Sequence, residues 1–167
     1  MALAHDLLEL SEVTLAADSP SEAALRRATS TAYYALFHLL ISEATANRPL
    51  FGRMFEHGKM KSACNQILEL DARVSNRQPK KRRPEIPFEQ PTTADHLCVV
   101  AKIFVQTQEW REFADYDMAS IWKAEDPEAQ VLQIVEAFRS WAAIREEFEA
   151  QKFLVLLLEP KQRASRT

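Results

Sequence analysis

The scarcity of glycine is the feature that most restricts the folds open to this chain. Only two of its 167 residues, Gly52 and Gly58, are glycine. Glycine-rich nucleotide sites need backbone with positive φ close to a phosphate, so a dinucleotide-binding fold is disfavoured, as is a β-sandwich with many tight turns. The segment 52–60 resembles a phosphate-binding P-loop. However, it has one residue too many between its glycines, and Met60 stands where that motif needs Ser or Thr.

Apolar residues recur at helical spacing through nearly the whole chain. This periodicity predicts an all-α fold, an antiparallel helical bundle of about five helices. We expect helices over residues 3–17, 20–47, 59–72, 93–114 and 126–148. Ser19 is predicted to cap the second helix, with Pro20 at its first position, and Asp126 to cap the last. Residues 153–158 fit either a helix tail or a short strand-like arm.

The second predicted helix is apolar around much of its circumference, which indicates a central, buried position. A more polar stripe runs along it and contains Arg27, Thr31, Tyr34 and His38. One interpretation is that this stripe lines a pocket or groove. The other is a helix edge whose tyrosine and histidine find local hydrogen-bond partners, as half-buried residues of these types commonly do.

Charge is distributed unevenly along the chain, whose net charge is −3. Residues 73–91 combine several prolines with a basic cluster and have no apolar period, so we expect a loop there. The basic side chains at the centre of the cluster are Lys80, Lys81, Arg82 and Arg83. They either contact phosphates or belong to a solvated surface loop. We expect one domain over residues 1–158, followed by a basic tail at 159–167.

The cysteines and the short apolar runs bear on metal sites, cofactors and the cellular compartment of the protein. Cys64 and Cys98 lie far apart without a CxxC pair, which is typical of buried free thiols. We therefore expect no metal site and no cofactor. The apolar runs fall well short of the roughly 18 residues that a membrane span needs, and the first residues do not form a signal peptide. A cytoplasmic protein without a membrane partner is expected.

An arginine interrupts the apolar face of the fourth predicted helix. The face that contains Leu97 and Phe104 continues, seven residues later, to Arg111. An arginine in that position needs a partner because burying an unpaired charge is very costly. Asp115 and Asp117 are the candidates. An acid that follows the arginine is the weaker order for a helical ion pair, so we expect the pair to do more than support the helix.

Two segments together resemble HEPN-domain proteins, in particular a small prokaryotic branch of that family. Residues 26–38, Arg-Arg-Ala-Thr-Ser-Thr-Ala-Tyr-Tyr-Ala-Leu-Phe-His, resemble the second helix of the branch, and residues 111–117, Arg-Glu-Phe-Ala-Asp-Tyr-Asp, resemble its later Arg-x-x-Ala-Asp-Tyr motif. His57 falls where the branch often has a histidine before its third helix. The resemblance implies a helical bundle that pairs as a homodimer. Many members are metal-independent ribonucleases, often toxins or defence proteins.

The ribonuclease motif of that family is an arginine followed by a histidine after four to six intervening residues. Arg111 matches the arginine, but positions 116–118 hold Tyr116, Asp117 and Met118. Metal-free RNA cleavage needs a base for the 2′-hydroxyl and an acid for the leaving oxygen, and histidine suits either task near neutral pH. The candidate catalytic residues are therefore Arg111, Tyr116 and His38, and the candidate binding residues are Asp115, Asp117, Arg27, Tyr34 and Lys80, Lys81, Arg82 and Arg83.

Three functions fit these residues. The missing histidine favours a homodimer that binds RNA, a nucleotide or a partner protein without efficient catalysis. A divergent metal-independent endoribonuclease would use Arg111 for phosphate and His38 or Tyr116 for protons. A purely structural module, such as half of a toxin–antitoxin pair with a cognate antitoxin as partner, would use Arg111 and Asp115 only as an ion pair. Some relatives act beside a nucleotidyltransferase that modifies a motif tyrosine, and Tyr116 is the candidate here.

Overall fold

The structure, a computed structural model, describes residues 1–46, 55–77, 90–117, 119 and 121–158, with the side chains of 75–77 excepted. In these parts every regular element is an α-helix. The helices are α1 (Ala2–Leu15), α2 (Glu22–Thr45), α3 (His57–Arg77), α4 (Thr93–Tyr116), α5 (Glu125–Ile144) and α6 (Phe148–Leu158). The predicted all-α class is confirmed, with six described helices in place of about five.

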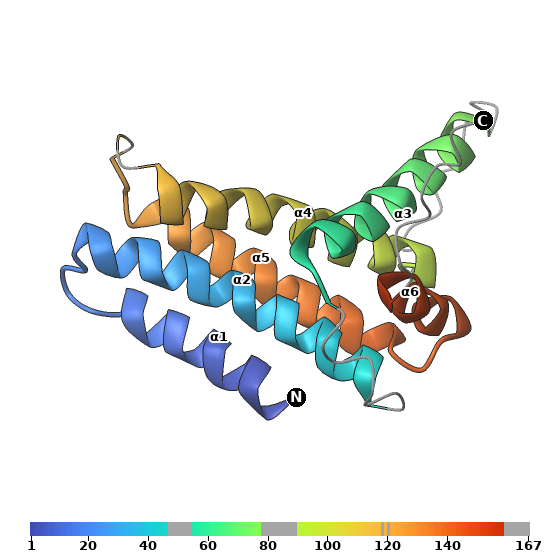
Figure 1. Cartoon of the computed structure of the whole chain (residues 1–167), viewed down its shortest axis with the longest axis horizontal. Helices are drawn as coiled ribbons and strands as arrows, with labels where there is room; N and C mark the ends of the chain where they lie inside the picture. The colour runs from blue at the N-terminus through green and yellow to red at the C-terminus, as the bar shows by residue number, and fades with distance from the viewer. Residues whose placement is uncertain (47–54, 78–89, 118, 120, 159–167) are drawn as a thin grey trace.

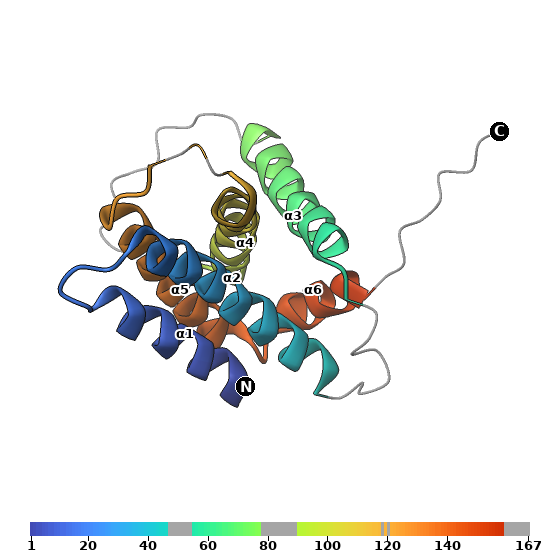
Figure 2. The same ribbon diagram turned by 60° about the vertical axis from the view of Figure 1, so that its left-hand side comes forward.

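Four helices form the body of the molecule, and the other two lie at one of its ends. The axes of α1, α2, α4 and α5 run roughly along a common direction, and α1 and α4 run opposite to α2 and α5 (Figure 1). Helix α3 projects away from this body and packs on α4 and α6 (Figure 2). Helix α2 contacts α1, α4, α5 and α6, so it occupies the centre of the fold.

The core confirms the central position predicted for the second helix. Tyr33, Leu36 and Leu40 of α2 are fully buried, together with Phe104 of α4 and Trp141 of α5. Burying a large apolar side chain contributes about 1.5–3 kcal/mol, so this region provides much of the cohesion of the bundle. Because so much of α2 is buried, only a narrow edge of the helix is left for polar contacts.

The start of α2 differs from the prediction. The helix begins at Glu22, and Ser21, rather than Ser19, is its N-cap. The Ser21 side-chain oxygen accepts a hydrogen bond from the backbone N–H of Ala24 at 3.2 Å. Either serine is chemically able to cap, because each has a side-chain oxygen for the free N–H groups of the first turn. With Ser21 in this position, Pro20 lies before the helix and not at its first residue.

The starts of α4 and α5 give one confirmed prediction and one correction. Helix α4 begins at Thr93 behind a capping box, in which Thr92 and Asp95 each bond the backbone N–H of the other. The predicted cap Asp126 is wrong, since Ala124 holds the N-cap position of α5 and Asp126 lies within the first turn. Acidic side chains in a first turn interact favourably with the helix dipole, so Asp126 still supports the helix start.

The C-terminal part is two helices, where the sequence predicted one helix over residues 126–148 and left residues 153–158 as a helix tail or a strand-like arm. Helix α5 ends at Ile144, and α6 begins at Phe148. The Gln151 side chain donates a hydrogen bond to the Arg145 carbonyl at 2.6 Å across the break. The change in direction brings Phe153 into the core, which explains why residues 153–158 form a helix rather than an arm.

Helix α3 is longer than predicted, because it runs from His57 to Arg77. Residues 73–77 of the expected loop are therefore helical. The basic residues 80–83 and the tail 159–167 lie outside the described residues. Among the helices that are described, none combines the length and the apolar character that crossing a membrane requires.

Candidate functional site

Arg111 lies near the end of α4, where that helix packs against the polar edge of α2. Its Nη2 atom donates a hydrogen bond to the Tyr34 hydroxyl at 3.1 Å. Its Nε atom lies 2.8 Å from Asp115 Oδ2 in an ion pair, one helical turn further along α4. The guanidinium carbon is 5.7 Å from the centre of the Tyr34 ring and 5.8 Å from that of Tyr116. The arginine is thus held between two aromatic rings and one carboxylate.

Asp115 joins α4 to α2 as well as to Arg111. The Ser30 hydroxyl of α2 donates a hydrogen bond to Asp115 Oδ1 at 2.6 Å, while Oδ2 faces Arg111. The sequence predicted that this pair does more than support its own helix, and in the structure Asp115 links Arg111 of α4 to Ser30 of α2. We call Ser30, Tyr34, Arg111, Asp115 and Tyr116 the Arg111 cluster.

His57, the first residue of α3, comes to the same side of α2. Its Nδ1 atom lies 2.6 Å from the Tyr33 hydroxyl, and its ring stacks on Phe37 with centroids 4.3 Å apart. The Tyr34 ring meets it edge-on at 5.9 Å. An imidazole therefore lies beside the Arg111 cluster, although it comes from a segment more than fifty positions before Arg111 in the chain.

The environment of His57 favours its neutral form. Partial burial lowers its pKa below the ordinary value of 6.5, and the positive charge of Arg111 lowers the pKa further. Burial also raises the pKa of Tyr33, so that hydroxyl keeps its proton at neutral pH. Partial burial alone would lower the pKa of Arg111, but Tyr34 and Asp115 outweigh it and raise that pKa. At neutral pH the site therefore holds a neutral imidazole beside a fixed positive charge.

The end of α4 that carries this cluster is held in place by Arg26 of α2. Arg26 Nη1 donates to the backbone carbonyl oxygens of Asp117 at 2.6 Å, Ala114 at 3.2 Å and Phe113 at 3.4 Å. Its guanidinium also lies 5.4 Å from the centre of the Trp122 ring. The carbonyls at a helix C-terminus have no partner within the helix, so an arginine there satisfies them and fixes the last turn.

The surface beside Arg111 is hollowed. A shallow hollow of about 670 Å³ is lined by Glu109, Arg111, Glu112, Phe113, Tyr116 and Asp117, and we call it the Arg111 hollow. The Arg111 side chain is 18% exposed and Tyr116 is 73% exposed, so both can be reached by a ligand. A cation and an aromatic ring at an open surface can bind a phosphate and a base together.

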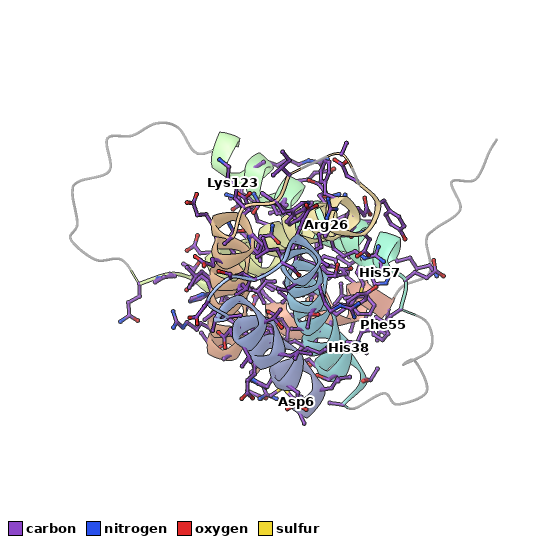
Figure 3. The ribbon with its side chains drawn as sticks, turned by 90° about the vertical axis from the view of Figure 1, so that its left-hand side faces the viewer. Asp6, Arg26, His38, Phe55, His57 and Lys123 are labelled. Carbon is purple, nitrogen blue, oxygen red and sulfur yellow. The ribbon has the colours of Figure 1, made fainter. Side chains whose placement is uncertain are left out.

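The structure separates the predicted site residues into two groups. Arg111, Asp115, Tyr34 and Tyr116 come together as described above. His38 is half-buried, and burial lowers its pKa, but it lies further along α2, with its ring 5.6 Å from that of its neighbour Phe37. In Figure 3, Arg26, His57 and His38 follow one another along the same side of the molecule.

The remaining predicted residues have other surroundings. Arg27 is exposed, whereas its neighbour Arg26 makes the contacts that fix α4. Asp117 is the C-cap residue of α4, and its carboxylate accepts a hydrogen bond from the Ala119 backbone at 2.9 Å. This gives Asp117 a role in ending the helix. The polar stripe of α2 is therefore partly a helix edge and contributes Tyr34 to the site. The basic residues 80–83 lie outside the described residues.

Sequence reasoning did not name four side chains of this region as site residues, namely Arg26, Ser30, Tyr33 and His57. Periodicity placed Tyr33 in an apolar stripe, where it is indeed buried, but it could not show that its hydroxyl reaches His57. The sequence did offer a signal for His57, because the family branch that the chain resembles often has a histidine before its third helix. His57 was nevertheless not named as a site residue. In the described part of the chain, no group of three or more acidic, histidine or cysteine side chains could hold a metal ion.

Comparisons of the chain with models of protein families, with curated proteins and with solved structures found no match.

Proposed function

We propose that this chain is a HEPN-like, homodimeric protein that binds RNA or a nucleotide phosphate at the Arg111 hollow without cleaving it efficiently. The observation that carries the proposal is the setting of Arg111. Its guanidinium is oriented by Tyr34 and Asp115, yet part of it lies at the wall of an open hollow beside the exposed ring of Tyr116. An arginine beside a stacking ring is a common way to recognise a phosphate and its base.

Carboxylates around the hollow set the expected strength of binding. Asp115 offsets the charge of Arg111, and Glu109, Glu112 and Asp117 line the same hollow. These charges oppose a phosphate, and Arg111 is the only cation that lines the hollow among the described residues, so we expect weak affinity with only a shallow dependence on salt. The aromatic contact with Tyr116 then provides a large share of the binding free energy.

A second function, metal-independent RNA cleavage, is favoured by one specific observation, the position of His57. The family motif places its histidine after the arginine, where this chain has none, but His57 supplies an imidazole beside the Arg111 cluster from α3. If the Tyr33 hydroxyl donates to Nδ1, then Nε2 carries the proton of the neutral ring and can donate a hydrogen bond to a phosphate oxygen. If Nδ1 donates to Tyr33 instead, then Nε2 is a base. His57 thereby replaces His38 as the better candidate for proton transfer.

One experiment distinguishes these functions. A short fluorescein-labelled single-stranded RNA is titrated with the protein at low and at physiological salt, and unlabelled total RNA is incubated with it in EDTA and run on a denaturing gel. We expect binding that Arg111→Met weakens about tenfold, with intact RNA on the gel. The control is Arg139→Ala, which removes an exposed arginine of α5.

The two functions predict different gels. Discrete fragments that disappear in both Arg111→Met and His57→Gln would establish the nuclease and overturn the proposal of binding without cleavage. If neither binding nor cleavage is seen with the wild-type protein, both proposals fail for RNA, and the structural module is the function that is left. In that case a lower melting temperature should be the only effect of Arg111→Ala, because Arg111 and Asp115 would then serve only to join α2 and α4.

A further inference from the structure

A second hollow lies next to the Arg111 hollow, where the end of α4 meets the start of α5. It has a volume of about 300 Å³. Its walls are Glu109, Trp110, Phe113, Ile121, Trp122 and Asp126, and we call it the aromatic hollow. The two hollows share Glu109 and Phe113. The other four residues, Trp110, Ile121, Trp122 and Asp126, line only this one.

The apolar walls of the aromatic hollow are unusually open to solvent for side chains of their type. Trp110 is 39% exposed, Phe113 56% and Ile121 87%. Exposed large apolar side chains that gather in one place commonly mark a surface that binds a partner. Tryptophan and other aromatic residues are also enriched among the side chains that dominate binding at such surfaces.

Charge determines which partner fits. Glu109 and Asp126 are the only charged side chains that line the aromatic hollow in the described part of the chain, and both are negative. Lys61 pairs with Glu109 at 3.0 Å, so Asp126 carries the larger share of the attraction. Lys123 is exposed near the hollow but does not line it. Aromatic faces and carboxylates together form a site for an organic cation.

The molecule itself contains an example of this recognition. The Arg26 guanidinium lies 5.4 Å from the centre of the Trp122 ring. Because Arg26 already occupies that ring, an incoming cation would have Trp110 and Phe113 as its main aromatic partners. A planar guanidinium suits them best, since it can stack on the rings while it donates hydrogen bonds to a carboxylate.

We propose that the aromatic hollow binds an arginine side chain from a basic segment of another protein. The partner presents this arginine between apolar residues that cover the exposed faces of Trp110 and Ile121. The chain's own basic tail is a poor occupant, because α6, which precedes it, lies at the opposite end of the molecule from the α4–α5 junction (Figure 1). A second copy that places its own aromatic hollow against this one is a poor occupant, since the carboxylates of the two hollows would repel each other.

The test uses a labelled peptide of arginine and leucine, and the same peptide with citrulline in place of every arginine. Citrulline keeps the length of the side chain but has no charge, so the pair isolates the contribution of the cation. Fluorescence anisotropy should show binding of the arginine peptide and at least about tenfold weaker binding of the citrulline peptide. Trp110→Ala and Asp126→Asn should each weaken binding of the arginine peptide severalfold.

The matched control is Leu132→Ala, which removes an exposed apolar side chain of α5 outside the hollow and should leave binding unchanged. Equal affinity for the two peptides, or wild-type affinity in Trp110→Ala, would overturn the proposal. The proposal would also fail if the protein alone were a dimer that Trp110→Ala converts to a monomer, because the occupant would then be a second copy. Melting curves of each variant check that the surface substitutions leave the fold intact.

This inference stands independently of the proposed function. Trp110→Ala changes a wall that the Arg111 hollow lacks, so RNA binding should persist in it. Arg111→Met should conversely weaken RNA binding and retain the arginine peptide. If Trp110→Ala and Arg111→Met each weaken the binding of both ligands, measured in separate titrations, to the same degree, then one shared surface binds both and the separate arginine site is wrong.

Discussion

The junction of α2 with α4 and the groove between α3 and α6 are held together in different ways. At the junction, Arg26, Ser30 and Tyr34 make hydrogen bonds to the last turns of α4. The groove, of about 590 Å³, is lined mainly by apolar side chains such as Ile67, Leu97 and Phe153. Hydrogen bonds are directional and fix where a helix ends, whereas apolar contacts are not directional and provide cohesion.

This difference predicts which substitutions cost stability and which disturb the site. The junction is partly open to solvent, so its polar contacts compete with water and each contributes modestly. The groove includes Phe153, which is almost completely buried and whose loss leaves a cavity. We therefore expect the largest losses of stability at the groove and the largest losses of site geometry at the junction.

The largest effect is expected for Phe153→Ala at the groove. The substitution removes a buried aromatic side chain and should lower the free energy of unfolding by about 3–5 kcal/mol. Urea unfolding followed by circular dichroism measures this value. Phe148→Ala, at an exposed position of the same helix that does not line the groove, is the control and should stay within about 0.5 kcal/mol of wild type. A loss at Phe153 no larger than that at Arg111 would contradict the comparison.

The next effect is expected for Arg111→Ala at the junction. Arg111 and Asp115 are partly exposed, so their pair lies between surface and buried ion pairs, and the loss should be about 1–3 kcal/mol. A double-mutant cycle with Ser30→Ala tests whether Asp115 transmits the effect to α2. Additive losses would show that the Ser30 and Arg111 contacts to Asp115 act independently.

A smaller loss of stability is expected for Arg26→Ala, and it should distinguish Arg26 from its neighbour Arg27. It removes the donor to three carbonyls at the end of α4 and should cost about 1–2 kcal/mol, with faster amide exchange in the last turn of α4. Arg27→Ala, at the exposed adjacent position, should change stability by less than about 0.5 kcal/mol. The same loss in both variants would mean that charge, and not these hydrogen bonds, holds the junction.

The smallest effect is expected for pH. Because burial and Arg111 lower the pKa of His57 in the folded protein below 6.5, the unfolded chain binds the proton more readily. The contribution of His57 to stability is therefore present above about pH 6.5 and is lost as the pH falls through the lowered value. Melting temperatures are measured from about pH 7.5 down to about pH 5.5, a range that brackets this window. The melting temperature should fall less over this range in His57→Gln than in wild type. His5→Gln on α1 is the control, and an equal change in both variants would assign the effect elsewhere.

Several elements could be predicted from the sequence because their signals are local. The periodicity of the apolar residues of α2 showed that it is central. The apolar period also placed the start of α4 at residue 93, where the capping box of Thr92 and Asp95 begins the helix. The break after Ile144 was not predictable, since the residues on both sides favour a helix. Whether such a run continues or bends depends on where the core is, and Phe153 reaches the core only if the chain turns.

The site shows the same division. The sequence by itself identified Arg111 as an arginine that needs a partner and gave Asp115 and Asp117 as candidates, because Asp115 lies one helical turn after Arg111 and Asp117 lies just beyond. Only the tertiary structure decided that Tyr34 orients the guanidinium, that Arg26 and not Arg27 holds α4, and that His57 supplies the imidazole. These contacts join segments distant in the chain. The packing of α2 against α4 and the position of the first residue of α3 beside α2 bring them together, and no local pattern encodes either.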